Sequence, residues 1–270
     1  SIINASNNKL DLLSLANNIS NVQSSDGITI DNEVPILGVV FDGLLDELDY
    51  TSSSDSISAK WSNFTDSLSG LLHYEYAVGS LLDTIEIIDW TITTDTFMVR
   101  HNLSLLNNRI YYVSVRSLDS ARNVSMIARS NGLTVDTQRP ISGIVYDGIS
   151  TDEDWTNSIE TLSGGWIEFY DEETGIRNYD YCIGTSPYSN NVIDWENVGL
   201  DTTYNQNNLS LESGTRYYTT VRAFDMAENI RISVSDGIIV DNTAPIISNV
   251  FDGYINSDID WQSISDSITI

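Results

Sequence analysis

The chain has 270 residues, and its 39 Asp and Glu against 12 Lys and Arg give a formal net charge of −27. This charge excludes a general nucleic-acid binder, because neutralising phosphates requires a basic surface. A content of 41% hydrophobic and 10% aromatic residues excludes a disordered tail. No apolar stretch approaches the roughly 20 residues that a membrane-spanning helix needs. Cys182 is the single cysteine, so neither an intrachain disulfide nor a cysteine-based zinc site is possible.

Three similar segments divide the chain. SDGITIDNEVP ends at Pro35, SNGLTVDTQRP at Pro140 and SDGIIVDNTAP at Pro245, a spacing of 105 residues in both cases. A period of this length predicts a tandem array of domains. We expect the chain to be an excerpt from a longer array, with the end of one repeat, two whole repeats and the start of another. In order, these parts are residues 1–32, 33–137, 138–242 and 243–270.

Each whole repeat contains short β-rich runs separated by turn residues, which is typical of an all-β sandwich rather than a helical solenoid. Seven strands in about 105 residues match the size of an immunoglobulin-like domain. In the first repeat we expect strands near residues 36–41, 55–62, 73–79, 86–91, 95–101, 110–118 and 124–135.

The strand between Tyr111 and Ser117 alternates with a period of two, which predicts which side chains are buried. The expected buried residues are Tyr111, Val113, Val115 and Ser117, and the expected exposed residues are Tyr112, Ser114 and Arg116. The recurrent aromatic residues Trp61, Trp166, Tyr111 and Tyr217 are expected in the two cores.

These motifs resemble those of fibronectin type III modules. LESGTRY at Leu211–Tyr217 is similar to the leucine-to-tyrosine corner of that family, and Leu105–Tyr111 repeats its spacing. A single tryptophan in the second strand and an Asp-x-Ala-x-Asn hairpin also match the family. These residues are Trp61, Trp166, Asp119, Asn123, Asp225 and Asn229. The resemblance implies an all-β fold of tandem seven-stranded fibronectin-III/immunoglobulin-like sandwiches, and a scaffold or adhesive role.

Acidic residues recur at the proline joints and in the DG segments that follow them. Because Ca²⁺ prefers six to eight oxygen ligands, a linker and an adjacent loop could supply a calcium site between modules. The alternative is that the DG pairs are turns and the remaining acids protect a solvated strand edge. The candidate calcium ligands are Asp31, Asp42, Asp49, Asp136, Asp147, Asp152, Asp154, Asp241, Asp252, Asp258 and Asp260.

Other candidate sites lie outside the acidic segments. Four tryptophans near predicted turns are expected to pack but are also the best candidates to contact a glycan or a partner: Trp90 and Trp195 foremost, with Trp155 and Trp261. Asn102 and Asn208 lie in glycosylation sequons at nearly equivalent positions. Cys182 aligns with Ala77 in an apolar strand, so we expect a small core residue rather than a nucleophile.

The sequence predicts a protein that is not an enzyme, because it shows no nucleophile elbow, phosphate loop or histidine-rich metal set. We expect a structural repeat segment of an extracellular stalk, surface fibre or filament, with neighbouring repeats or copies of itself as partners. Two alternatives stay open. One is a calcium-stiffened adhesin at the cell surface that binds glycans or another cell, and the other is a spacer in a secreted hydrolase.

Overall fold

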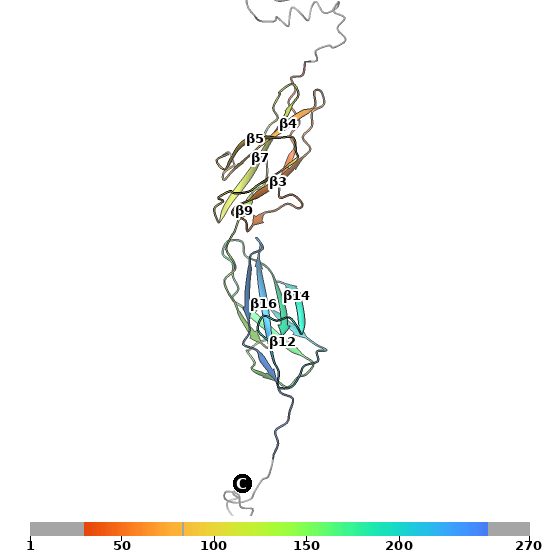
Figure 1. Cartoon of the computed structure of the whole chain (residues 1–270), viewed down its shortest axis with the longest axis vertical. Coiled ribbons are helices and arrows are strands. Elements are labelled where there is room, and N and C mark those ends of the chain that lie inside the picture. The colour runs from red at the N-terminus through yellow and green to blue at the C-terminus, as the bar shows by residue number, and fades with distance from the viewer. Residues whose placement is uncertain (1–29, 83, 248–270) are drawn as a thin grey trace, which may run out of the picture.

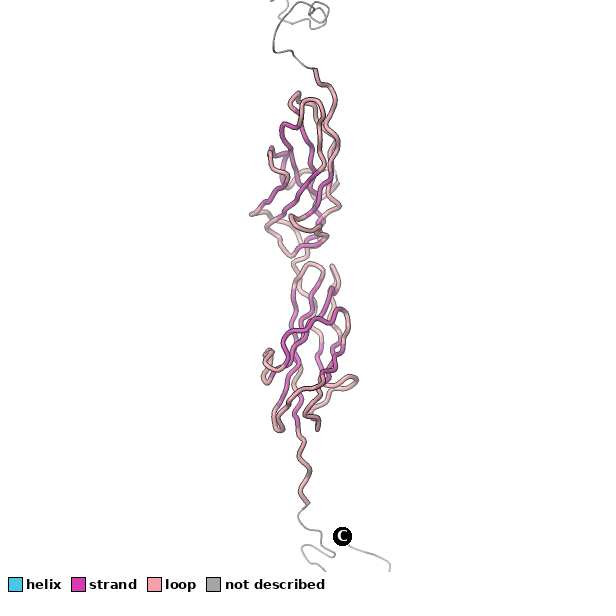
Figure 2. The backbone as a smooth tube through the Cα atoms, turned by 90° about the vertical axis from the view of Figure 1, so that its right-hand side faces the viewer, coloured by secondary structure: helices cyan, strands magenta, loops and turns pink. Residues whose placement is uncertain are grey.

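The structure, a computed structural model, describes residues 30–82 and 84–247. These residues form strands and loops (Figure 2), and none of them belongs to a helix long and apolar enough to cross a membrane. Two domains follow one another along the long axis of the molecule, and the chain enters and leaves at opposite poles (Figure 1). The expected partial repeats, 1–32 and 243–270, lie almost entirely outside the described residues.

The first domain is a sandwich of two sheets. A three-stranded sheet has the order β1-β3-β6, and the facing sheet has the order β2-β9-β7-β4-β5, with β8 also paired to β7. The strands are β1 (Val39–Asp42), β2 (Tyr50–Thr51), β3 (Ile57–Ser62), β4 (Leu71–Gly79), β5 (Ile88–Thr93), β6 (Phe97–Arg100), β7 (Arg109–Asp119), β8 (Ala128–Arg129) and β9 (Leu133–Val135).

The second domain repeats this topology strand for strand. Its sheets have the orders β10-β12-β15 and β11-β18-β16-β13-β14, with β17 also paired to β16. The strands are β10 (Ile144–Asp147), β11 (Trp155–Thr156), β12 (Leu162–Ile167), β13 (Ile176–Gly184), β14 (Ile193–Gly199), β15 (Thr203–Gln206), β16 (Arg216–Asp225), β17 (Ile230–Val234) and β18 (Ile238–Val240).

The topology is that of a fibronectin-III/immunoglobulin-like sandwich. β5 pairs with β4, and β14 pairs with β13, so this strand belongs to the larger sheet in both domains. In an immunoglobulin constant domain, by contrast, the fourth strand joins the sheet that contains the first two strands. The predicted fold class is therefore confirmed. Two details differ from the predicted strands: the last one, 124–135, is divided into β8 and β9, and the two-residue strands β2 and β11 were not predicted.

The recurrent aromatic residues occupy the cores as predicted. Trp61 and Trp166 are 3% and 0% exposed, and each contacts a tyrosine edge-on at ring-centroid distances of 5.8 and 5.7 Å. The hydroxyl of Tyr111 accepts a hydrogen bond from the Leu106 N–H at 2.8 Å, and Tyr217 accepts one from Glu212 at the same distance. Both domains therefore contain the tyrosine corner that the resemblance implied.

One position of the alternating strand departs from its prediction. Ser114 was expected to be exposed but is 4% exposed, because β8 pairs with β7 at this point and places Arg129 opposite Ser114. Cys182 is fully buried, as expected for a small core residue, and burial raises the pKa of its thiol to about 11.

Candidate functional site at the domain joints

Three aspartates meet where the first domain is joined to the second. Asp136 follows β9 in the linker, Asp171 follows β12, and Asp225 ends β16. One carboxylate oxygen from each lies within 4.8 Å of the other two, and all three side chains are buried. We call this set the joint triad.

Hydrogen bonds hold each member of the joint triad in place. Asp171 Oδ1 accepts from the backbone N–H groups of the loop that follows it, at Glu173 (3.1 Å), Thr174 (2.8 Å) and Gly175 (3.1 Å). Asp136 accepts from the Gln138 N–H at 2.9 Å and from the Thr174 hydroxyl at 2.6 Å. The side chains of Asp136 and Thr174 thereby attach the linker to the loop that follows β12 of the second domain.

Asp225 is positioned by the hairpin that the sequence singled out. It accepts from the N–H of Asn229 at 2.8 Å and from the Asn229 side-chain amide at 2.9 Å. The same amide donates to the main-chain oxygen of Asp136 at 2.8 Å. The Asp-x-Ala-x-Asn motif therefore connects the end of β16 to the linker.

A fourth acid, Glu173, lies beside the joint triad. Its Oε1 accepts from the Asn107 side chain of the first domain at 2.7 Å, and its Oε2 is buried without a hydrogen-bond partner among the described residues. Burial and the contact with Asp136 raise the pKa of Glu173. Burial raises the pKa of Asp225, and the charges of Asp136 and Asp171 raise it further. The hydrogen bonds from Asn229 act in the opposite direction.

The same arrangement precedes the first domain. Asp31, Asp66 and Asp119 bring one carboxylate oxygen each within 4.8 Å, and Asn123 bonds Asp119 and the main-chain oxygen of Asp31. Asp31 and Asp66 are less buried than their counterparts. A hydrogen bond with Ser69 lowers the pKa of Asp31. Asp66 and Asp171 were not predicted as site residues, although their exact repetition at 105 positions was the available signal.

The DG aspartates form a separate site deeper in each domain. Asp42 and Asp147 are 0% and 1% exposed, and each accepts a hydrogen bond at 3.0 Å from a glycine N–H, of Gly132 and Gly237. Asp147 also accepts from the Thr219 hydroxyl, whereas Asp42 Oδ1 has no partner among the described residues. Desolvation is the main reason that the pKa of both carboxyls rises to about 6.

The DG turn itself depends on glycine. Gly43 and Gly148 have φ values of +87° and +102°, and a Cβ atom at either position would lie within 2.8 Å of a backbone oxygen. The DG pairs are therefore turns, as the alternative interpretation has it, and the turn directs Asp42 and Asp147 inward.

The structure therefore separates two groups of predicted calcium ligands. Asp136 lies with Asp171 and Asp225, whereas Asp147 lies with Asp152 and Asp236 in another three-carboxylate set. Asp49, Asp154 and Asp241 are exposed and belong to neither set. Asp252, Asp258 and Asp260 lie outside the described residues.

Trp90 and Trp195 are half-buried on the outer face of the larger sheets. The guanidinium of Arg116 lies over the Trp90 ring at 4.3 Å, and that of Arg222 over the Trp195 ring at 3.4 Å. An arginine therefore covers one face of each indole. Their role as ligand contacts stays a prediction, as does glycosylation at Asn102 and Asn208, whose side chains are both exposed.

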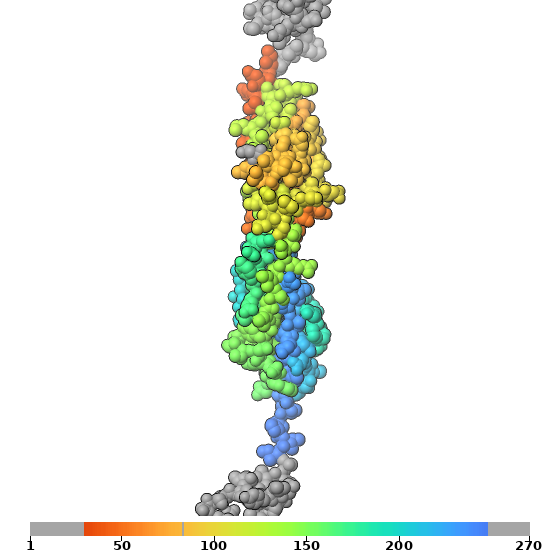
Figure 3. Space-filling model, turned by 90° about the vertical axis from the view of Figure 1, so that its left-hand side faces the viewer, coloured from red at the N-terminus to blue at the C-terminus, as the bar shows by residue number. Residues whose placement is uncertain are grey.

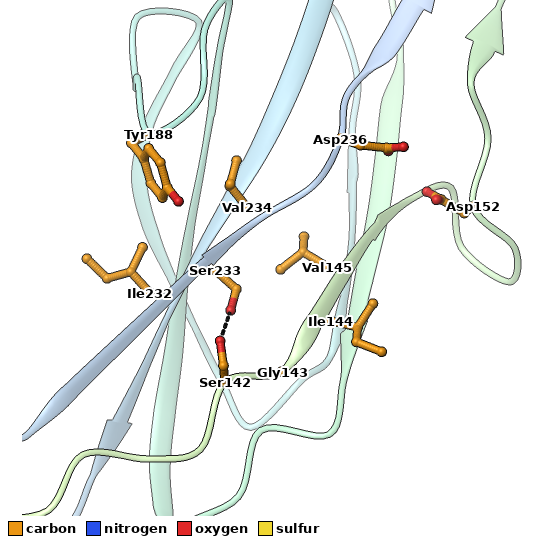
Figure 4. Close-up of a pocket in the computed structure, with 10 residues that line it drawn as sticks. All are labelled: Ser142, Gly143, Ile144, Val145, Asp152, Tyr188, Ile232, Ser233, Val234 and Asp236. Carbon is orange, nitrogen blue, oxygen red and sulfur yellow. Dashed lines mark hydrogen bonds between the residues drawn. The ribbon is translucent and has the colours of Figure 1, made fainter.

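The second domain also has a hollow of about 420 Å³ between β10 and β17. Figure 4 shows Asp152 and Asp236 together on one side of it and Tyr188 on the other, with a hydrogen bond of 2.9 Å between the Ser142 and Ser233 hydroxyls. The facing edges of these two strands form no backbone ladder with each other. β17 is therefore an edge strand of its sheet.

No family model and no curated protein matches the chain. Among solved structures, the FN1–FN3 domains of chicken CNTN1 are similar, with 18% identity, a TM-score of 0.42 and coverage of 72% of this chain and 65% of that one. The chain thus spans slightly less than two thirds of that fragment. Domains A168-A170 from titin are similar with 16% identity, a TM-score of 0.46 and coverage of 77% and 68%. The described residues form two tandem fibronectin-III/immunoglobulin-like sandwich domains.

Proposed function

We propose that this chain is a non-enzymatic structural segment of a long extracellular array, such as a stalk, surface fibre or filament. The observation that supports the proposal most strongly is the joint itself. The same triad of aspartates, with the same asparagine bonded to the linker backbone, precedes both domains. Each repeat thus holds the linker that enters it.

The contacts at the joint favour a stiff connection. The five-residue linker, Asp136–Pro140, begins and ends with a buried residue. The Pro140 oxygen accepts from Arg231 Nε at 2.7 Å. Asn107 of the first domain accepts from the Thr137 N–H at 2.7 Å and donates to Glu173 of the second. Proline further restricts the backbone, so the joint has few free torsions.

Charge supports an extended form of such an array. With a net charge of −27, neighbouring domains repel one another within the Debye length of roughly 8–10 Å. The first and last described residues lie at opposite poles of the molecule (Figure 3). Further repeats can therefore continue along the same axis. Repulsion and a short joint together keep successive domains apart and prevent them from folding back.

Two measurements test this proposal. Small-angle X-ray scattering of the 270-residue chain in 0.15 M NaCl should give one extended particle, and the profile of two freely tumbling domains would contradict the stiff joint. Antibodies against residues 33–242 should label intact source cells. Labelling that appears only after permeabilisation would contradict the extracellular location.

A second candidate is the calcium-stiffened adhesin, which the joint triad favours. Three buried carboxylates within 4.8 Å, with Glu173 beside them, provide the oxygen-rich and anionic surroundings that Ca²⁺ prefers. Calcium that bound only the folded state would stabilise it by about 2.7 kcal/mol at one hundred times the dissociation constant. In a domain of this size that stabilisation raises the melting temperature by about 10 °C or more.

The calcium candidate is tested by thermal unfolding with millimolar CaCl₂, with chelator, and with MgCl₂ at matched ionic strength. The Asp171→Asn variant keeps an acceptor for the loop N–H groups but removes one charge, and it should lose most of the calcium effect. The exposed Asp201→Asn variant should keep it. Equal melting temperatures with and without calcium would contradict this candidate. Glycan binding that survives Trp195→Ala would contradict the predicted adhesive contact.

A further inference from the structure

Three arginines of the second repeat converge on one hollow. Residues 138–242 contain five basic side chains against eighteen acidic ones. Arg139, Arg222 and Arg231 line a single hollow of about 500 Å³ together with Ile230 and Ile232. We call it the arginine hollow. Such a concentration of positive charge is unexpected in a repeat with so large an excess of carboxylates.

None of these three arginines forms an ion pair with a carboxylate among the described residues. Arg222 lies on the Trp195 ring, Arg231 donates from Nε to the Pro140 oxygen, and Arg139 is exposed without a side-chain partner. Two other arginines of the described residues form ion pairs with glutamates. Arg116 bonds Glu75 at 2.6 Å, and Arg177 forms an ion pair with Glu228. The charge of Arg222 also acts on Asp194, whose pKa it helps to lower. The arginine hollow therefore presents mainly the guanidinium groups of Arg139 and Arg231 to a carboxylate of a partner.

The first domain lacks this arrangement, so the fold does not require it. The position equivalent to Arg231 is Ser125, and the position equivalent to Arg139 is Val34. Arg116, the counterpart of Arg222, is already neutralised by Glu75. The arginine hollow is therefore a feature of the second repeat alone.

The chain itself presents a surface that complements the arginine hollow. The loop at residues 44–49, LLDELD, combines three exposed acids with three exposed leucines, and Leu45 is 87% exposed. Ile230 and Ile232, which are 37% and 43% exposed, would receive the leucines, while the arginines would receive the acids. The exposure of Leu45 shows that the loop is not seated in the hollow of its own molecule.

The overall negative charge does not prevent such a contact. At 0.15 M ionic strength the Debye length is about 8 Å, so charges beyond the contact are largely screened. Groups that meet at hydrogen-bond distance are screened much less. A contact between two different surfaces of the same chain is head-to-tail, and it extends into an open filament where the rotation between successive copies does not close a ring.

We infer that the arginine hollow is a lateral docking site for the 44–49 loop of a second copy of this chain. The inference rests on the proposed function, since it supplies the contact between neighbouring chains in a fibre or filament.

Sedimentation velocity of the 270-residue chain, from micromolar to millimolar concentration in 0.15 M NaCl, tests the inference. The wild-type chain should self-associate. Arg139→Glu with Arg231→Glu should weaken association at least tenfold, and so should Asp46→Arg with Asp49→Arg in the loop. The control is Arg109→Glu with Arg122→Glu, which makes the same charge change at exposed arginines of the first domain and should leave association unchanged.

Mixing the two weakened variants provides the decisive measurement. Each variant lacks a different half of the contact, and the reversed charges are again complementary, so the mixture should associate where neither variant does alone. Matched melting temperatures exclude unfolding as the reason for any loss.

Two outcomes would overturn the inference. One is a wild-type chain that stays monomeric at millimolar concentration, and the other is association that the hollow variant does not weaken. Binding of a galacturonate oligomer to a monomeric chain, lost on Arg139→Glu with Arg231→Glu, would assign the hollow to an acidic glycan instead. The labelling experiment, and scattering extrapolated to zero concentration, do not depend on this contact, so the proposed function can hold while the inference fails.

Discussion

The side-chain amide of Asn229 donates a hydrogen bond to the main-chain oxygen of Asp136, 93 residues earlier in the chain, at 2.8 Å. Asn123 makes the equivalent bond to Asp31, at 3.2 Å. In each domain, the hairpin after its longest strand therefore holds the linker that enters the domain. The geometry of the joint is thus shared by both described repeats rather than confined to one pair of domains.

Replacing Asn229 by alanine should loosen the joint and destabilise the second domain. The variant loses the bond to Asp136 and one bond to Asp225, which leaves a buried carboxylate oxygen without its donor. A loss of about 1–3 kcal/mol is expected. Urea unfolding measures this loss, and X-ray scattering measures the flexibility of the joint. The exposed Asn205→Ala variant is the control, and equal values for both variants would show that the amide does not fix the joint.

The tyrosine corner offers a test with an adjacent control. Tyr217→Phe removes the hydroxyl that accepts from the Glu212 N–H at 2.8 Å, and the free energy of unfolding should fall by about 1–3 kcal/mol. Tyr218→Phe removes the hydroxyl of a half-buried tyrosine, which has no hydrogen-bond partner among the described residues, and it should cost less than about 0.5 kcal/mol. Chemical denaturation followed by tryptophan fluorescence distinguishes the two.

The core and the fold class were predictable because their signals are local. Alternation identified Tyr111, and the spacing from Leu105 identified the corner. Two-residue strands such as β2 carry no periodic signal, so they were not predicted. The joint triad was only partly predictable, because Asp171 reaches Asp136 through folding of the domain and not through spacing in the linker. For the same reason the sequence could not separate the joint aspartates from Asp147.

Burial of the DG aspartates predicts a particular dependence on pH. The pKa of Asp42 and Asp147 rises to about 6 in the folded state, from about 3.9 when unfolded. The contribution of each protonated carboxyl to stability is complete below pH 4 and is lost as the pH rises through about 6. Two pKa units correspond to about 3 kcal/mol per domain.

Asp42→Asn with Asp147→Asn removes that ionisation. Relative to wild type, the stability of this variant should therefore increase between pH 4 and pH 7, as followed by urea unfolding at each pH. Asp95→Asn with Asp201→Asn changes two exposed carboxyls and should show no such trend. A constant difference between the variant and wild type across this range would mean that the buried carboxyls do not titrate there.

Glycosylation can be checked directly. Asn102 and Asn208 are exposed at equivalent turns with φ of +60°, so both sequons are accessible to a transferase. Secretion of the chain from a eukaryotic host should give glycan on both residues. Mass spectrometry before and after enzymatic deglycosylation measures the mass of this glycan. Asn102→Gln with Asn208→Gln should remove that mass. Unmodified asparagines at both positions would contradict the prediction.

The two-residue parallel pairs affect how the chain responds to force. β11 pairs with β18 in parallel, through bonds from the Ile239 N–H to Asp154 and from the Asp241 N–H to Thr156 at 2.9 and 2.8 Å. Tension applied at the two poles pulls β11 back toward the start of the domain and β18 toward its end. Parallel strands pulled in this way slide past each other, so their bonds must break together rather than one at a time. This pair in the second domain, and the pair of β2 with β9 in the first, therefore resist mechanical extension of their domains.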